Sequence, residues 1–258
     1  LTEFLPVSST GHLILTTDWL GVEYEDAGVK AFEIVIQAGA LLAVVGYYHR
    51  QVRSMARGLL GRDAAGLRLA IQLFVAFLPA AVVGLAANKA IKQYLFGPWP
   101  VVAALAAGGV AMIAVEVWRG RRGGDGERDL ASMSWRAALA IGCFQCLAMW
   151  PGTSRSMATI VAALLLGFTP QAAAEFSFLL ALPTLGAATA FDGLKHGGAI
   201  LDASGWLGLA IGFGVSMVVA WLAIKGFLAW LKRHGLVPFG VYRIFLAVLF
   251  VLISLHKG

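Results

Sequence analysis

Long apolar stretches constrain this 258-residue chain more than any other feature of its sequence. They approach the roughly 20 residues that an α-helix needs to cross a bilayer. Six such spans are expected, at 31–48, 69–88, 100–118, 172–191, 206–229 and 239–256. Only 13% of the residues are charged, against roughly 25% in soluble domains. The sequence therefore predicts an all-α integral membrane protein that forms one polytopic domain over residues 1–258.

Two further apolar pieces, 1–20 and 137–167, are interrupted by prolines, glycines and polar clusters. Non-helical backbone at membrane depth is tolerated only where protein buries it or where it lines a wet cavity. We therefore expect each piece to be a re-entrant helical hairpin that places a polar tip inside the membrane. Small residues, as in Gly108-Gly109, would let the surrounding helices approach closely.

The hairpins suggest an internal repeat, because each one precedes a span that carries a glutamate. The motifs Phe32-Glu33-Ile34 and Ala174-Glu175-Phe176 lie in these two spans. We predict that six transmembrane helices and two re-entrant hairpins form inverted repeats, with halves at approximately 1–118 and 119–258. Transporter folds of this kind place their site at the repeat interface.

The net charge of +6 comes mainly from arginines in short connections between the apolar spans. A nucleic-acid-binding protein would instead gather this charge on one exposed face, so we expect no nucleic-acid partner. The connections at 49–68, 119–136 and 232–238 are the basic ones. The positive-inside rule places these three connections in the cytoplasm.

The first polar cluster combines a carboxylate, hydroxyls and an imidazole within ten residues: Glu3, Ser8, Ser9, Thr10 and His12. Ser9 and His12 are three residues apart, so one helical turn could place them on one face. Such groups can build a nucleophile and its base. Alternatively, Ser8 or Ser9 caps the helix that follows. Glu3 could act as a base or hold a hard cation such as Mg²⁺ or Ca²⁺.

The second polar cluster surrounds Arg155. A central arginine in a membrane helix costs roughly 2.5–3.5 kcal/mol, so its guanidinium needs a partner. That partner is either a carboxylate of Glu3, Glu33 or Glu175, or the oxygens of a bound phosphate, whose geometry matches the guanidinium. Hydroxyl groups that could add hydrogen bonds to such an anion are those of Ser154, Ser156 and Thr159. Pro6 and Pro151 each stand two residues before a hydroxyl pair, which aligns Ser8-Ser9 with Thr153-Ser154.

Two other features have an ordinary explanation beside a functional one. Arg243 lies near the start of the last span, where its side chain could snorkel to the membrane surface or reach the site. Cys143 and Cys146 form a CxxC motif inside an apolar run, where small helix residues are common, and a redox or metal role would need further ligands.

The string Leu1-Thr2-Glu3-Phe4-Leu5-Pro6-Val7-Ser8-Ser9-Thr10-Gly11-His12 resembles a signature of the bacterial undecaprenyl-diphosphatase family, known for bacitracin resistance. Pro151-Gly152-Thr153-Ser154-Arg155-Ser156 resembles a second signature, and similar stretches at 32–37, 142–147 and 175–181 extend the resemblance over essentially the whole chain. The resemblance implies a multi-pass enzyme of the bacterial inner membrane whose site opens toward the periplasm. This enzyme would remove the terminal phosphate of undecaprenyl diphosphate and so recycle the lipid carrier for peptidoglycan synthesis.

The resemblance also implies roles for individual residues. The catalytic set would be Glu3, Ser9, His12 and Arg155, with a divalent cation, Mg²⁺ or Ca²⁺, near Glu3. Substrate-binding hydroxyls would come from Ser8, Thr10, Ser154, Ser156 and Thr159. We prefer Ser9, assisted by His12, as the nucleophile, with His12 as the second choice. The family has another acidic residue a few positions before Glu3, so we expect the natural chain to extend before Leu1.

Two rival functions are compatible with the same sequence. Inverted repeats with broken helices are also a transport design, so the chain could be a flippase that moves a polyprenyl phosphate across the bilayer. It could instead be a structural membrane subunit with buried ion pairs. The expected partners are the bilayer, a polyprenyl diphosphate and, as a further expectation, a second copy of the chain in a homodimer.

Overall fold

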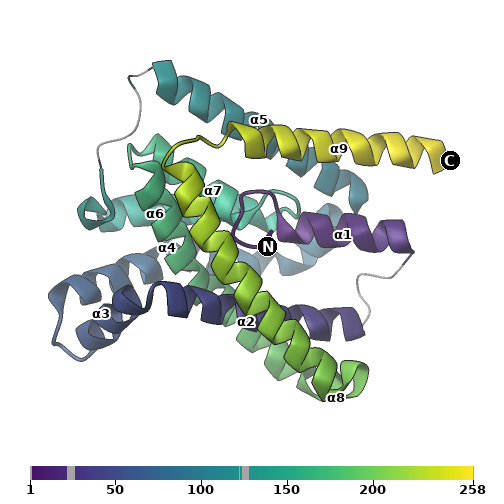
Figure 1. Cartoon of the computed structure of the whole chain (residues 1–258), viewed down its shortest axis with the longest axis horizontal. Coiled ribbons are helices and arrows are strands. Elements are labelled where there is room, and N and C mark those ends of the chain that lie inside the picture. Colours follow the sequence, from purple (N-terminus) through teal and green to yellow (C-terminus); the bar gives the residue numbers. More distant parts are fainter. Residues whose placement is uncertain (1, 22–26, 122, 124–127, 258) are drawn as a thin grey trace.

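The computed structural model describes residues 2–21, 27–121, 123 and 128–257. Within them the regular structure is helical, apart from an isolated bridge between Arg128 and Phe168. In chain order the helices are α1 (Ser9–Leu20), α2 (Ala27–Tyr47), α3 (His49–Leu59), α4 (Ala64–Leu95), α5 (Pro98–Arg121), η1 (Leu130–Ser132), α6 (Trp135–Gln145), η2 (Cys146–Met149), α7 (Arg155–Leu165), α8 (Pro170–Leu231) and α9 (Val237–Lys257). Figure 1 shows their arrangement.

Five segments in the described part of the chain are long and apolar enough to cross a membrane. They are Ala64–Ala87, Pro98–Arg121, Pro170–Phe191, Leu207–Leu231 and Val237–Leu255. A sixth is present if the bent pair Phe32–Tyr47 and His49–Leu59 counts as one span. The structure therefore confirms that the described part of the chain is helical and holds five to six candidate membrane spans.

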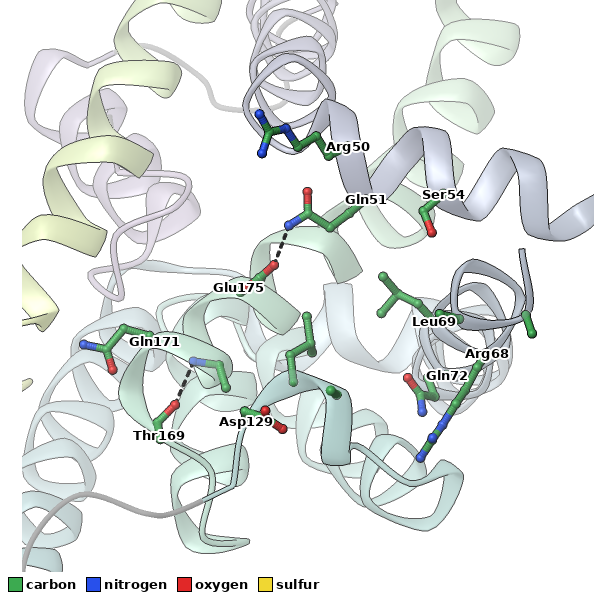
Figure 2. A pocket seen from close by; sticks show the side chains of 15 residues that line it. Arg50, Gln51, Ser54, Arg68, Leu69, Gln72, Asp129, Thr169, Gln171 and Glu175 are labelled. Carbon is green, nitrogen blue, oxygen red and sulfur yellow. Dashed lines mark hydrogen bonds between the residues drawn. The ribbon is translucent and has the colours of Figure 1, made fainter. Parts of the chain in front are cut away.

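Helix α3 replaces most of the irregular connection expected after the first span. It leaves α2 at an angle of 85°. Its arginines Arg50, Arg53 and Arg57 are exposed, whereas Met55 packs against the core. A basic amphipathic helix at right angles to a span has the geometry of a helix that lies along a membrane surface. Gln51 of this helix donates a hydrogen bond to Glu175 of α8 (Figure 2).

Helix α8 contains two of the expected spans and folds back on itself. Its 62 residues would measure roughly 93 Å if the helix were straight. Instead, the Nε2 of Gln171 lies 3.3 Å from the carbonyl oxygen of Leu231, and the ring centroids of Phe178 and Phe227 lie 5.9 Å apart. The two arms of α8 therefore run antiparallel and side by side (Figure 1).

The spans pack closely where glycine occupies the contact. Helix α2 lies along α8, and α5 lies along α9 (Figure 1). A Cβ atom at Gly109 would stand 2.7 Å from the carbonyl oxygen of Gly240, and a Cβ at Gly240 would stand 2.8 Å from that of Gly109. This reciprocal contact requires glycine on both helices, as the small-residue content of the sequence predicted.

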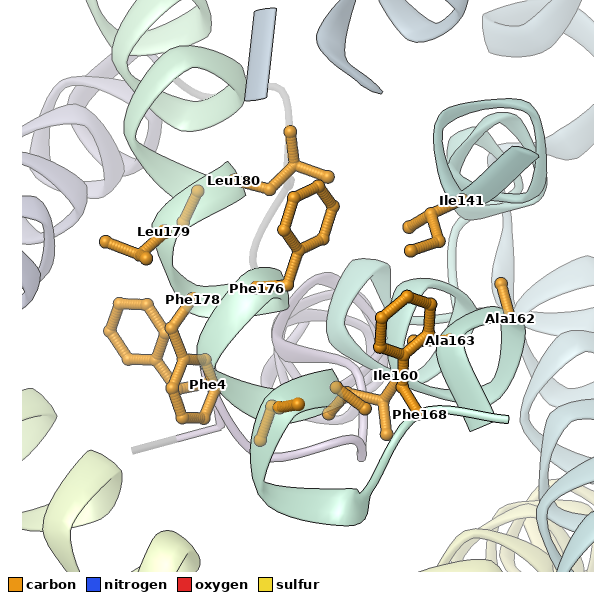
Figure 3. Packing of buried hydrophobic residues seen from close by; sticks show 14 of the residues in the cluster. Phe4, Ile141, Ile160, Ala162, Ala163, Phe168, Phe176, Phe178, Leu179 and Leu180 are labelled. Atoms are coloured by element: carbon orange, nitrogen blue, oxygen red, sulfur yellow. The ribbon is translucent and has the colours of Figure 1, made fainter. Parts of the chain in front are cut away.

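A chain of aromatic rings anchors the N-terminal turn in the core. The fully buried ring of Phe4 packs edge-on against Phe178, with centroids 5.5 Å apart (Figure 3). Phe178 contacts Phe227, which in turn contacts Phe239 of α9. The residue next to Glu3 is thus fixed against Phe178 of α8, which limits where the Glu3 carboxylate can lie.

The two polar clusters, which the sequence predicted to lie at hairpin tips, contact each other in the structure. Residues 2–8 form a turn that leads into α1, and residues 150–154 form a turn between η2 and α7. The Ser156 hydroxyl donates to the carbonyl oxygen of Leu5 across 3.1 Å, which joins the two turns. Trp135–Met149 and Arg155–Leu165, on either side of the second turn, are each too short to span a bilayer.

Candidate active site

Two serines with an unusual backbone begin the helices that carry the site. Ser8 caps α1 and accepts a hydrogen bond from the Gly11 N–H, and Ser154 caps α7 and accepts one from the Met157 N–H. Both have positive φ, 71° and 74°, a region that costs a non-glycine residue about 1–3 kcal/mol. The capping role expected for Ser8 is confirmed. Such strain recurs at functional sites, where the surrounding structure enforces it.

Ser9, the first residue of α1, is bonded to the carboxylate expected beside it. Its Oγ donates a hydrogen bond to Glu3 Oε2 across 2.5 Å. Short bonds between a hydroxyl and a carboxylate are among the strong ones in proteins. A carboxylate at this distance can take the hydroxyl proton as the oxygen attacks an electrophile. The pair therefore has the geometry of a nucleophile and its base.

A cavity of about 220 Å³ opens in front of this pair. Its polar lining comes from both turns and its apolar lining from Phe96, Met149 and Leu185. The remaining lining residues are Glu3, Ser8, Ser9, Thr10, Ala148, Pro151, Gly152, Ser154 and Arg155. The structure thus brings together six of the nine predicted site residues around one space.

Arg155, the first residue of α7, presents unused hydrogen-bond donors in this cavity. Its Nη1 donates to the carbonyl oxygen of Ser177 across 3.0 Å, and its Nη2 lies 4.0 Å from Glu3 Oε1. Among the described residues, Nε and Nη2 are buried and make no hydrogen bond. Leaving a buried donor unpaired costs about 1–3 kcal/mol, and more for a charged group. An anion with paired oxygens in the cavity would satisfy both nitrogens.

Of the three carboxylates proposed as partners of Arg155, Glu3 is the one beside it. The other two accept hydrogen bonds from glutamines elsewhere. Glu33 accepts from Gln37 at 3.2 Å, and Glu175 accepts from Gln51 at 2.8 Å. Glu175 lines a different cavity of about 860 Å³ beside α3 (Figure 2), which shares no lining residue with the site.

His12 stabilises the first turn, residues 2–8, through a hydrogen bond and does not line the cavity. Its Nδ1 lies 2.7 Å from the carbonyl oxygen of Ser8, and its Nε2 lies 2.8 Å from the Tyr242 hydroxyl. Because a carbonyl can only accept, Nδ1 carries the proton and Nε2 accepts from Tyr242. The assistance expected between His12 and Ser9 is therefore not made in this arrangement, where Glu3 contacts the Ser9 hydroxyl.

Ser156 and Thr159 likewise do not line the cavity. The Ser156 hydroxyl bonds Leu5 and lies 3.1 Å from Ser154 Oγ. The Thr159 hydroxyl lies 2.7 Å from Ser177 Oγ and 2.9 Å from the carbonyl oxygen of Arg155. Both hydroxyls are used within the protein. Sequence reasoning missed Ser177, whose carbonyl orients Arg155; its position two residues after Glu175, in a stretch similar to the family, was the available signal.

One carboxylate is available for a divalent cation at the site. The described residues contain no cluster of three or more histidine, cysteine, aspartate or glutamate side chains placed to hold a metal. Mg²⁺ commonly binds through one or two carboxylates together with substrate phosphates. Glu3 fits that mode, in which protein and substrate hold the cation together. Cys143 and Cys146 are free thiols outside the cavity lining.

Comparison with known proteins gives the family. The family model for the bacitracin resistance protein BacA matches residues 1–249. An undecaprenyl-diphosphatase of Sorangium cellulosum is 57% identical over 250 residues, covering 96% of this chain and 81% of that protein. The undecaprenyl-diphosphatase of Methylococcus capsulatus is 46% identical over 258 residues, covering 100% of this chain and 92% of that protein. The undecaprenyl-diphosphatase of Thermoanaerobacter sp. strain X514 is 41% identical over 257 residues, covering 100% of this chain and 93% of that protein. The chain belongs to the BacA family.

Proposed function

We propose that this protein hydrolyses undecaprenyl diphosphate to undecaprenyl phosphate and inorganic phosphate, which recycles the lipid carrier for cell-wall synthesis and confers bacitracin resistance. One observation carries the chemistry: two buried nitrogens of Arg155, Nε and Nη2, make no hydrogen bond among the described residues, and Arg155 lines a cavity together with the hydrogen-bonded pair of Ser9 and Glu3. The names of its relatives give the substrate and favour hydrolysis over lipid transport.

The cavity suits the terminal phosphate of a lipid diphosphate. Arg155 offers Nε and Nη2 to two phosphate oxygens, the paired arrangement that a guanidinium prefers. The hydroxyls of Thr10 and Ser154 line the same space. The side chains of Phe96, Met149 and Leu185 form an apolar part of the lining that the polyprenyl tail can contact. Arg155 would also stabilise the charge that develops on the phosphoryl oxygens during transfer.

Ser9 is the nucleophile in this proposal, and Glu3 is its base. Ser9 Oγ bonds to the terminal phosphorus while Glu3 takes the hydroxyl proton. The bond from that phosphorus to the bridging oxygen breaks, and undecaprenyl phosphate leaves. Water then attacks the phosphoserine; one of its hydrogens stays on the released phosphate and the other goes to solvent. Glu3 returns its proton to Ser9 Oγ as that oxygen departs.

A divalent cation, Mg²⁺ or Ca²⁺, would be held by Glu3 and the substrate's phosphate oxygens. When bound, this cation would neutralise part of the negative charge of the diphosphate. His12 supports the turn through the Ser8 carbonyl. Attack by His12 itself would require one ring nitrogen to leave its present partner and the ring to enter a cavity that it does not line.

We also propose the orientation and repeat that the sequence predicted. The site cavity includes Phe96, at one end of α4, whereas the arginine-bearing α3 adjoins the other end. If the arginines face the cytoplasm of the bacterial inner membrane, the cavity faces the periplasm. The matching caps at Ser8 and Ser154 support inverted halves with re-entrant hairpins. A homodimer is part of this proposal and would appear as a doubled mass in native mass spectrometry.

The test is phosphate release from undecaprenyl diphosphate by purified protein in liposomes. Ser9→Ala removes the attacking oxygen and Arg155→Lys removes the paired donors. We expect both to lower kcat/KM by about 100-fold or more. Thr17→Ala, which removes a hydroxyl bonded only to backbone in the same helix, should leave the rate unchanged. Near-normal rates in both site variants, or lipid translocation without hydrolysis, would refute the proposal.

A further inference from the structure

Arg243 is a buried cation that the proposed reaction does not use. Sequence reasoning allowed its side chain to snorkel from the start of the last span. The structure instead places it inside the protein, where its exposed fraction is 0%. Among the described residues no carboxylate lies within ion-pair distance of it. A charge without a counter-ion persists inside a protein only where other groups stabilise it.

Backbone carbonyls stabilise this guanidinium, and they use all five of its N–H donors. Nε donates to Leu105 at 3.3 Å. Nη1 donates to Pro6 at 3.1 Å and to Thr153 at 2.9 Å. Nη2 donates to Ala104 at 3.0 Å and to Gly152 at 2.8 Å. The side chain therefore joins both polar turns to α5.

The bonded carbonyls occupy matching places in the two turns. Pro6 lies two residues before Ser8, and Gly152 lies two residues before Ser154. Ser8 and Ser154 are the non-glycine residues with positive φ in the described chain. A strained conformation persists only where the surrounding structure enforces it. The Arg243 guanidinium thus restrains the backbone of both turns two residues before the strained cap serine.

Helix α5 is shaped to admit the guanidinium. A Cβ atom at Gly108 would stand 2.2 Å from Arg243 Nη2 and 2.8 Å from Cζ. Any side chain at this position would displace the planar group from its carbonyls. Gly120, on the same helix, has nothing within 4 Å of its ideal Cβ position.

We propose that Arg243 is a positioning residue that fixes the two turns relative to each other, so that Ser9 and Arg155 face one cavity. It acts through the carbonyls of Pro6, Gly152 and Thr153 and does not line the cavity itself. This inference rests on the proposed phosphatase function, because it assigns a part in that reaction.

The experiment compares two ways of displacing the guanidinium. Arg243→Lys keeps the charge but offers a single nitrogen, which cannot reach five carbonyls. Gly108→Ala keeps the arginine and pushes it aside. We expect either change to lower kcat about tenfold or more while KM changes less than threefold, because the turns misalign the reacting groups. Arg119→Lys, at a buried arginine paired with Glu116, and Gly120→Ala are the matched controls and should retain wild-type kcat.

Hydrogen exchange gives a readout that does not depend on turnover. Arg243→Lys and Gly108→Ala should speed amide exchange in residues 4–12 and 150–158, and leave exchange in α4 and in Leu207–Leu231 of α8 unchanged. Wild-type kcat and exchange in both variants would overturn the positioning role. A general rise in exchange over all helices would show a purely structural role and would also overturn it. Absence of phosphate release from the wild type would instead refute the proposed function, and the role of Arg243 in it.

Discussion

Ser8 and Ser154 adopt a similar backbone conformation with positive φ at the N-caps of two different helices. The residues that follow them, Ser9 and Arg155, therefore occupy the same first helical position in α1 and α7. Alignment of the two sequence clusters by their prolines paired Ser8-Ser9 with Thr153-Ser154, which is wrong by one residue. The second turn contains an extra residue between proline and cap, and Gly152 with φ of 98° accommodates it.

This conformation predicts the order of stability at each cap. Alanine at Ser8 or Ser154 removes the capping oxygen and keeps a Cβ where φ is positive. Glycine removes the oxygen but tolerates the backbone. We expect each alanine variant to be about 1–2 kcal/mol less stable than the glycine variant at the same position. Thermal unfolding of the detergent-solubilised variants measures this difference.

Ser134 is the control for this prediction. It caps α6 through the Ala137 N–H with an ordinary φ of −97°. The difference in stability between its alanine and glycine variants should be smaller, because at this ordinary φ an alanine carries no backbone strain and the two variants differ only in N-cap preference. Equal gaps at Ser134 and Ser8 would show that the positive φ carries no strain.

His12→Asn distinguishes a bracing histidine from an attacking one. The asparagine amide nitrogen can take the place of Nδ1 and keep the hydrogen bond to the Ser8 carbonyl. We expect this variant to retain at least about a tenth of wild-type kcat, whereas His12→Ala should lose about 100-fold. Phosphate release under single-turnover conditions is the measurement. If His12→Asn is as inactive as His12→Ala, the imidazole itself takes part in the chemistry.

Glu3→Gln tests the base. The amide can accept the Ser9 hydroxyl bond but cannot take its proton, so kcat should fall about 10²–10⁴-fold with little change in KM. Asp129→Asn, at a carboxylate that caps η1 away from the site, is the control and should keep full activity. A Glu3→Gln enzyme with normal kcat would exclude Glu3 as the proton acceptor.

The sequence predicted the spans well because hydropathy and length leave few alternatives in a bilayer. It did not predict that the spans at 172–191 and 206–229 belong to one helix folded on itself, since side-chain contacts such as Phe178 with Phe227 are non-local. Nor did it predict α3, whose arginines were interpreted as a connection. An amphipathic surface helix has a mixed composition that a search for apolar runs overlooks.

The site was predictable in its residue types and less so in its contacts. Glu3, Ser9 and Arg155 stood out because polar groups in an apolar chain need partners. Which hydroxyl or nitrogen each would meet depends on turn geometry that spacing alone does not determine. The interior place of Arg243 depends on Gly108, a residue 135 positions earlier whose importance appears only when α5 and α9 pack together.

Removal of divalent cations should abolish turnover without unfolding the protein. Among the described residues, Glu3 is the one carboxylate that lines the cavity, so protein alone would offer a cation few ligands and substrate phosphates would supply the rest. We expect EDTA to stop phosphate release, Mg²⁺ or Ca²⁺ to restore it, and the melting temperature without substrate to stay the same. A large fall in that melting temperature on chelation would instead reveal a structural metal.

Asp63 ties α3 to α4 and makes their junction sensitive to acid. Its carboxylate accepts a hydrogen bond from the Gly66 N–H at 3.0 Å and one from the Ser54 hydroxyl at 2.7 Å. These bonds lower the pKa of Asp63 below its usual value. A group whose pKa is lower in the folded state stabilises the protein above its unfolded pKa, and this contribution is lost as pH falls through the folded value.

Asp63→Asn should therefore melt a few degrees below the wild type at pH 7, and the difference should shrink as the pH falls below about 4. Thermal unfolding at both pH values is the measurement, and a difference that stays constant with pH would contradict the role of the carboxylate charge.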